Sequence, residues 1–326
     1  MFNRKNKNSH VSIEINDYVL RALVSKGPDL SQAEVFEAAL PHDVIDEATL
    51  KDEMALFEIF KENATRWGGK NQHVRFFVPD PTVLLKSFEH PRDVEVNKLK
   101  EYVQMELGHS IHLPFQDPLI DVYDPTEGDG HAMMFAAASE EVNKYINLFL
   151  DINMDPQAAD IRALCNLRLL EKLQIIDNEK TYLIANWLVN ELSICIYSNG
   201  HVDFLRFQQI PTTISQWHAK PLNENELEFT YDGDLEDYRM TIMDQVLELD
   251  RIMNFFRFSL HKGEKSVDEI IVMGDNPLIE NVYNYIQDTL PVTVKMVDDS
   301  LIDKNYPGFK AKHASLLGLA LKEIQS

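Results

Sequence analysis

Two histidines and two acidic residues have a spacing that could hold a metal ion. His109 and His112 are three residues apart, and Asp117 and Asp121 follow them. Imidazole nitrogens and carboxylate oxygens are common zinc ligands. The histidines fall, however, at the expected end of a helix just before Pro114. We therefore expect hydrogen-bonded surface or capping histidines here rather than a metal site.

An acidic run and two cysteines are the other candidates for chemistry. Asp232-Gly233-Asp234 with Glu236 and Asp237 resembles the start of a calcium loop. Its glycine comes before the required sixth position and no twelve-residue ligand pattern follows, so a solvated acidic turn is expected. The only cysteines, Cys165 and Cys195, are too few for a disulfide framework or a sulfur-ligated metal. The sequence contains neither a P-loop nor a G-x-S-x-G motif.

Composition limits the class of protein. The chain has 326 residues, 44% of them hydrophobic, which is typical of a soluble globular protein, and its length favours two domains. A net charge of -22 argues against a nucleic-acid partner, because phosphate binding depends on a basic surface. Residues 1–10 are basic but lack the apolar stretch of a signal peptide, and no run reaches the ~18 apolar residues that span a bilayer. We expect a cytoplasmic protein without direct membrane insertion, which is peripheral to the membrane through a partner.

The elements that position these residues follow an order that occurs twice. Each half begins with three strand-like runs joined by turn residues, and helices and buried strands follow. The expected initial strands are Val11–Ile15, Tyr18–Ser25 and Gln32–Leu40 in the first half, and Tyr182–Asn186, Glu191–Tyr197 and His201–Gln208 in the second. The pattern predicts helices over Thr49–Arg66, Val94–Leu107, Ser139–Leu150 with Ser139 as the cap, Arg162–Leu173, Tyr238–Leu260, Pro277–Thr289 and His313–Ile324. This order predicts a duplicated α/β fold with two halves around a cleft.

Particular sequence fragments, in this order, resemble the PilM family of actin-like type IV pilus assembly proteins, relatives of the cell-division protein FtsA. Ile13-Glu14-Ile15-Asn16 stands where the family has an I-D-I-G strand end, and Leu113-Pro114-Phe115 is similar to its I-P-F-P step. Gly318-Leu319-Ala320-Leu321 matches the closing G-L-A-L. The fragments extend over about 300 residues. The resemblance implies an actin-like (ribonuclease H-like) fold with an inserted α+β subdomain in the first half.

The resemblance also implies a division of the chain. Residues 10–90 with 157–176 would form the first actin-like subdomain, and 91–156 the inserted subdomain. Residues 177–215 with 262–326 would form the second, and 216–261 a small insertion with a long helix. The phenylalanines near the end of that helix are expected in the core.

Actin-like folds hold ATP with Mg²⁺ between two hairpin turns and a glycine-rich turn, where backbone amides approach the phosphates. Glu14 stands here for the family's Asp, and Asn16 for its Gly. Asn186-Trp187-Leu188 replaces D-I-G, and Gly274-Asp275-Asn276 replaces G-G-G. Leu188 adds an apolar side chain, and Asp275 adds negative charge, where phosphate should approach. We therefore expect a vestigial nucleotide site formed by Glu14, Asn16, Asn186, Leu188, Gly274, Asp275 and Asn276.

The family implies a scaffold that binds the cytosolic N-terminal tail of a PilN-like bitopic membrane protein. The implied groove lies between the first-half sheet and the inserted subdomain, which here indicates Val74–Val78, Thr82–Phe88 and the 94–107 helix. Tyr102, Met105 and Leu107 are its candidate apolar contacts. We expect a non-enzyme without cofactor, in a type IV pilus or related secretion machine. The alternatives are weak nucleotide binding, and a nucleotide-switched actin-like ATPase or filament.

Overall fold

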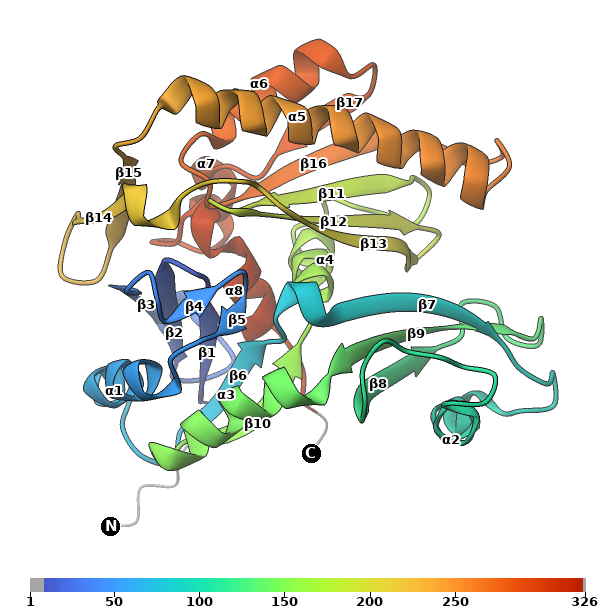
Figure 1. Ribbon diagram of the computed structural model, residues 1–326, viewed down its shortest axis with the longest axis horizontal. Helices are drawn as coiled ribbons and strands as arrows, with labels where there is room; N and C mark the ends of the chain where they lie inside the picture. The colour runs from blue at the N-terminus through green and yellow to red at the C-terminus, as the bar shows by residue number, and fades with distance from the viewer. Residues whose placement is uncertain (1–8, 325–326) are drawn as a thin grey trace.

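Two five-stranded sheets of the same topology form the two halves of the protein. The computed structural model describes residues 9–324 (Figure 1). The first sheet has the order β10-β6-β1-β2-β3 and the second β13-β12-β11-β16-β17. In each, three antiparallel strands are followed by two parallel ones, which confirms the predicted duplication. The strands are β1 (His10–Ile15), β2 (Val19–Ser25), β3 (Glu34–Ala39), β6 (His73–Phe77), β10 (Asp155–Asp160), β11 (Tyr182–Trp187), β12 (Glu191–Ser198), β13 (His201–Gln209), β16 (Glu269–Gly274) and β17 (Thr293–Met296).

Two helices lie between the sheets. These are α4 (Arg162–Lys172) and α8 (Ala314–Ala320), which pack against each other (Figure 1). Gly318 makes their close approach possible, since a Cβ there would lie 2.0 Å from the carbonyl oxygen of Cys165. The other faces are covered by α1 (Glu53–Asn63), α3 (Ser139–Asp151), α5 (Leu235–Asn254), α6 (Ile279–Thr289) and α7 (Asp299–Asn305).

The largest core cluster is shared by both halves. It extends from Ile13 in β1, through Leu169 in α4 and Leu316 in α8, to Ile184 and Ile271 in the second sheet. A second cluster fills the space between the second sheet and the helices α5 and α6. The halves therefore share one hydrophobic core, whose apolar area is removed from water only when both are in place.

The inserted unit is a separate three-stranded sheet with its own core. Its order is β7-β9-β8, and α2 packs against β8. The structure shifts the predicted limits of 91–156, because β7 belongs to this sheet, α3 packs into the shared core and β10 belongs to the first sheet. The elements of the unit are β7 (Val83–Glu89), α2 (Leu99–Glu106), β8 (Pro118–Tyr123) and β9 (His131–Ala138).

Several elements differ from the prediction in their limits, and two short hairpins were not predicted. The helix predicted from Thr49 begins at Glu53, because Asp52 accepts a hydrogen bond from the Ala55 amide and caps it. Ser139 is the first residue of α3 and makes no capping bond. The last helix, α8, is shorter than the predicted His313–Ile324. Two short hairpins were not predicted: β4 (Ile45–Asp46) with β5 (Thr49–Leu50), and β14 (Trp217–Pro221) with β15 (Leu227–Tyr231).

No helix within residues 9–324 combines the length and the apolar character needed to cross a membrane.

Candidate functional site: the closed cleft between the halves

The residues predicted to form a vestigial nucleotide site come together. The β1–β2 turn, the β11–β12 turn and the end of β16 meet between the halves, as expected for hairpins at equivalent places of two similar sheets. Glu14, Asn16, Leu188 and Asn276 are all buried there. Asn186 is buried too, but its Oδ1 lies 3.4 Å from Oγ of Ser315 on α8.

The two turns contact each other directly. The Asn190 amide donates to Oδ2 of Asp17 at 2.8 Å. The Tyr18 hydroxyl donates to Oδ1 of Asp275 at 2.6 Å and accepts from the Val189 amide at 3.4 Å. These hydrogen bonds connect the halves at the place where actin-like proteins hold phosphates.

A buried arginine from β2 forms the centre of this contact. Arg21 lies 3.1 Å from Glu14 and 2.8 Å from Glu37 of its own sheet, and 2.7 Å from Asp275 of the second half. Burial alone would lower the pKa of Arg21, but the charges of Asp275, Glu14 and Glu37 outweigh it and hold the pKa well above its usual value. The guanidinium is therefore a permanent internal counter-ion.

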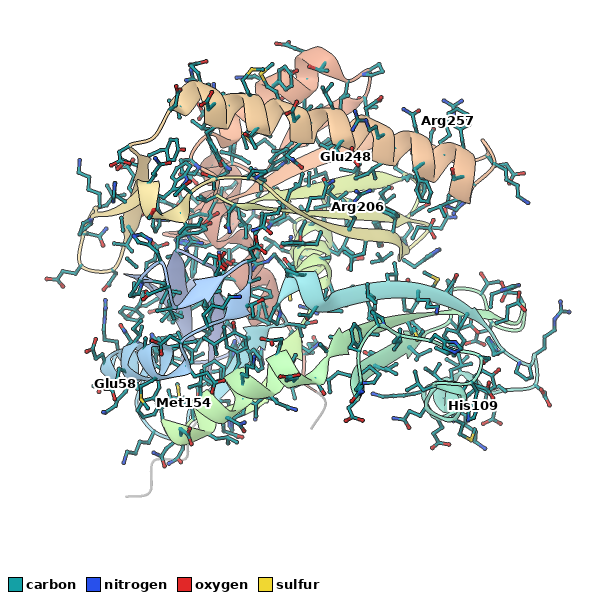
Figure 2. All side chains as sticks on the ribbon, viewed as in Figure 1. Glu58, His109, Met154, Arg206, Glu248 and Arg257 are labelled. Atoms are coloured by element: carbon teal, nitrogen blue, oxygen red, sulfur yellow. The ribbon has the colours of Figure 1, made fainter. Side chains whose placement is uncertain are left out.

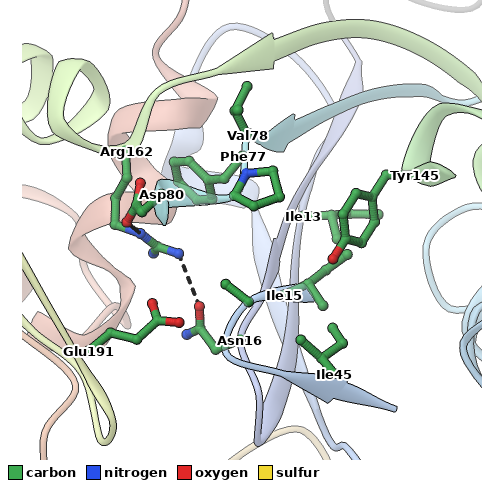
Figure 3. Close-up of a pocket in the computed structure, with 12 residues that line it drawn as sticks. Ile13, Ile15, Asn16, Ile45, Phe77, Val78, Asp80, Tyr145, Arg162 and Glu191 are labelled. Atoms are coloured by element: carbon green, nitrogen blue, oxygen red, sulfur yellow. Dashed lines mark hydrogen bonds and ion pairs between the residues drawn. The ribbon is translucent and has the colours of Figure 1, made fainter. Parts of the chain in front are cut away.

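A second arginine occupies the opposite side of Glu14. Arg162, the first residue of α4, pairs with Glu14. It also donates to Oδ2 of Asp80 at 2.9 Å and to Oδ1 of Asn16 at 3.0 Å (Figure 3). Its guanidinium also lies 4.6 Å from the ring centre of Phe77. Burial would raise the pKa of Glu14, but Arg162 and Arg21 hold it below its usual range. Both oxygens of the carboxylate are thus used by arginines.

Glu191, the first residue of β12, has the opposite environment. Burial raises its pKa well above the usual value, and the neighbouring charges of Asp17 and Asp80 add to this shift. This environment therefore favours the protonated, neutral form of the side chain.

The remaining space in the cleft is small. The cavity beside Asn16, Arg162 and Glu191 has a volume of about 20 Å³ (Figure 3), which is room for about one water molecule. Gly274 does not line an open nucleotide pocket, because a Cβ there would lie 2.0 Å from the carbonyl oxygen of Trp187. The residues present therefore do not fit ATP with Mg²⁺ in this arrangement.

The β14–β15 hairpin of the second half closes one end of the contact by packing on the first half. The Glu37 amide donates to the Asn225 carbonyl at 3.0 Å, and the Leu227 amide donates to Oε2 of Glu37 at 2.6 Å. The rings of Phe229 and Tyr18 meet edge to face with centres 5.0 Å apart. We call this hairpin, Trp217–Tyr231, the clasp.

The metal candidates from the sequence are not assembled. Within residues 9–324, no group of histidine, cysteine or acidic side chains is placed to hold a metal ion. Asp234 instead caps α5 by accepting from the amides of Glu236 and Asp237, and Asp232 pairs with His218.

Of the predicted tail-binding residues, Tyr102 and Met105 lie on α2, at the outer side of the inserted unit, and Leu107 directly follows this helix (Figure 1). Tyr102 stacks on Phe88, Leu107 packs partly into the core of the unit, and Met105 is 68% exposed. The structure does not bring them to the predicted Val74–Val78, because β6 is paired on both sides, by β1 and β10, and is largely buried.

A larger cavity lies where the inserted unit meets both halves. Its volume is about 400 Å³. Tyr123 and Phe135 come from the inserted unit, Leu164 and Glu171 from α4, and His201 from the start of β13. The Tyr123 hydroxyl donates to the Val202 carbonyl at 2.6 Å and links the inserted unit to the second half. The sequence pattern gave no indication that these three parts meet.

Comparison with known proteins gives the family. The model of a family described as type IV pilus assembly protein PilM matches residues 19–304. The chain belongs to the PilM family. The match begins after β1, so Glu14 and Asn16 lie outside it. No curated protein matches the chain.

Solved structures support the PilM fold. A structure described as a PilM-PilN type IV pilus biogenesis complex is 18% identical, with a TM-score of 0.73 over 96% of this chain and 97% of that one. A Bacteroides thetaiotaomicron protein with an actin-like ATPase fold is 10% identical, with a TM-score of 0.51 over 99% of each chain. Ethanolamine utilization protein EutJ from Carboxydothermus hydrogenoformans is 8% identical, with a TM-score of 0.53 over 96% of this chain and 89% of that one. The predicted actin-like fold is thereby confirmed.

The sequence interpretation missed the two arginines of the PilM-like cleft. A charged residue inside an apolar strand, as Arg21 is in Val19–Ser25, was the available signal. Such a residue is buried only with partners, and acidic residues at the neighbouring turns were candidates.

Proposed function

We propose that this PilM-family chain is a pilus-assembly scaffold that holds the cytosolic tail of a PilN-like membrane protein and does not hydrolyse ATP. Family membership and the fold shared with the PilM-PilN complex support the scaffold. In this proposal the partner holds the protein at the cytoplasmic face of the membrane.

The absence of hydrolysis is proposed from the closed cleft. Catalysis by an actin-like ATPase would need a carboxylate free to organise magnesium and water, and backbone amides free to meet phosphate. Both oxygens of Glu14 are bound by arginines, and the Asn16 amide donates to the Val19 carbonyl at 2.9 Å. The ion pair between Arg21 and Asp275 replaces the ligand that would otherwise lie between the halves.

The tail is proposed to bind in the 400 Å³ cavity beside the inserted unit. Phe135 and Leu164 offer an apolar floor for side chains of an extended peptide. Asp121 and Glu171 are exposed at its edge and can attract the basic residues that flank membrane spans on the cytoplasmic side.

Tail binding is tested with a fluorescent peptide covering the cytosolic tail of a PilN-like protein from the same organism. The full protein should bind it, and Leu164→Ala should weaken binding about tenfold, because about 1.4 kcal/mol of apolar contact corresponds to that factor. The matched variant Met105→Ala, at a 68% exposed position of α2, should leave binding unchanged.

A reversed result, with loss of binding only in Met105→Ala, would place the tail on the α2 face that the sequence predicted. No binding by the unaltered protein at near-millimolar concentration would overturn the scaffold proposal itself.

Nucleotide binding is tested separately by thermal unfolding with and without millimolar Mg-ATP. A ligand at 100 times its Kd adds about 2.7 kcal/mol and shifts the transition by several degrees. We expect no shift. A magnesium-dependent shift would favour the nucleotide-switched alternative.

A further inference from the structure

The C-terminal end of the long helix exposes apolar side chains. The helix α5 continues into a π-helical segment, Phe255–Leu260. The π-helix is rare in proteins overall, but where it occurs it is often found at functional sites. Phe256 is fully buried, as predicted for this segment. Phe255 and Phe258, however, are 47% and 58% exposed, and Leu260 is 44% exposed. The prediction that these phenylalanines belong to the core is therefore correct only in part.

The same segment is basic in an acidic protein. Residues 251–265 contain four lysines and arginines and one acidic residue, whereas the chain has 31 basic and 53 acidic residues. The Arg257 guanidinium lies 4.9 Å from the ring centre of Phe258, so charge and aromatic surface are joined. We define the α5 tip as Phe255, Arg257, Phe258, Leu260 and Lys262.

Two of the four basic side chains in residues 251–265 form no ion pair within the described part of the protein. Arg251 and Arg206 both pair with Glu248, and Lys265 pairs with Asp203. Within the described part of the chain, Arg257 and Lys262 form no ion pair, and both are exposed. Their charge is therefore available to an outside partner.

The α5 tip also has a suitable shape and position. The helix runs across the second sheet and continues past its end, where Arg257 lies (Figures 1 and 2). Phe255 meets Phe204 of β13 beside a groove of about 440 Å³. A protruding end with rings and cations suits a broad, flat surface better than a concave protein pocket.

We propose that the α5 tip contacts the headgroup layer of an anionic lipid membrane. Aromatic side chains favour the membrane–water interface, and lysine and arginine are attracted to acidic lipids. The rest of the protein, with its acidic excess, is repelled by the same lipids, so one orientation is selected. The residues that flank the tip are linked to the cavity proposed for the tail, because Asp203 binds both His201, which lines that cavity, and His261 and Lys265. The lipid contact does not depend on tail binding.

Vesicle sedimentation of the full protein, without any PilN-like partner, tests the proposal. Vesicles of phosphatidylcholine with about one-third phosphatidylglycerol should bind the protein, whereas pure phosphatidylcholine should not, and added salt should weaken binding. The double variant Phe258→Ser, Lys262→Glu should lower the partition coefficient about tenfold or more. The matched control Met54→Ser, Lys61→Glu makes the same kinds of change at exposed positions of α1 and should have no effect.

Charge and folding are separated by a second pair of variants. Arg257→Gln should bind acidic vesicles more weakly than the unaltered protein, whereas Arg257→Lys should bind them as well as the unaltered protein does. Both variants should unfold at the same temperature as the unaltered protein. No binding to acidic vesicles, equal binding to both vesicle types, or binding unaffected by the tip variants would overturn the proposal. If the tip variants lost binding to a purified protein partner but still bound acidic vesicles, the tip would be a protein interface, and the lipid proposal would be overturned too.

Discussion

Arg21 in the first half and Asp275 in the second lie 2.7 Å apart, and each side chain is 2% exposed. This ion pair crosses the cleft that actin-like proteins fill with nucleotide. Because the guanidinium also holds Glu14 and Glu37, four charges from β1, β2, β3 and the end of β16 form one buried group. The halves are thus connected by side chains of the protein itself.

Replacing this arginine should strongly destabilise the fold. In Arg21→Met, three buried carboxylates lose a shared counter-ion, which costs about 3–5 kcal/mol in comparable sites. Urea unfolding followed by circular dichroism measures the loss. The control Arg239→Met removes a partly exposed arginine whose pair with Glu236 is on the surface, and should cost under about 1 kcal/mol. Equal, small losses in both variants would contradict an essential role for the buried group.

Glu191 should make stability fall as pH rises. Its pKa is raised in the folded protein, so the folded state holds a proton that the unfolded chain releases above its own value near 4.5. Its contribution to stability therefore falls from about pH 4.5 upward, until the folded pKa is passed. In Glu191→Gln this penalty is absent. We expect the variant to gain stability relative to the unaltered protein between about pH 5 and pH 8, as measured by urea unfolding at both values. A constant difference between the two proteins would show that the carboxyl is ionised throughout.

A side chain at Gly274 should lower the free energy of unfolding. Its φ is +125°, and an added Cβ would meet the backbone of Trp187 at 2.0 Å. Gly263→Ala is the matched control, since Gly263 also has a positive φ, of +90°, but has open space around it. We expect the control to cost about 1 kcal/mol of backbone strain and Gly274→Ala about 1–3 kcal/mol more from the clash. Thermal unfolding distinguishes them, and similar losses would mean that strain alone decides.

The clasp should loosen when its aromatic contact is removed. Phe229→Ala deletes the ring that packs on Tyr18, so residues 217–231 should exchange their amide hydrogens faster, while β7–β9 of the inserted unit should not change. Hydrogen exchange with mass spectrometry gives both regions in one experiment. Met240→Ala, at an exposed position of α5, controls for simple loss of volume. Unchanged exchange in the clasp would show that Glu37 and its backbone contacts suffice to hold it.

The sequence predicted the parts of the fold that depend on local pattern. Alternating apolar residues and turn chemistry located the three antiparallel strands of each sheet, whereas Asn16 and Gly274 were assigned to the cleft by the resemblance to the PilM family. It did not predict the clasp, although Trp217, Leu227, Phe229 and Tyr231 follow the alternation of apolar and polar residues that is typical of strands.

Pairings between distant residues could not be read from the sequence. Arg21 meets Asp275 only because two sheets face each other, and no local spacing encodes that contact. The predicted peptide groove combined Val74–Val78 with Thr82–Phe88 and the 94–107 helix, and the sequence did not show that the first of these strands lies inside a sheet. Strand order, which makes β6 an interior strand, is a property of the assembled sheet.

The position of α8 also affects how the protein is made. This helix contacts β1, β2 and β6 of the first sheet, yet it is synthesised only after all the strands of the second sheet. At about 5–20 residues per second, a ribosome needs roughly 8–30 s for the residues between the end of β10 at Asp160 and the start of α8 at Ala314. During that time the face of the first sheet that packs on α8 lacks this helix. The inserted unit has a core of its own and can therefore fold early. Nascent chains of this protein are therefore suited to early protection by a chaperone that shields the strands near the N-terminus.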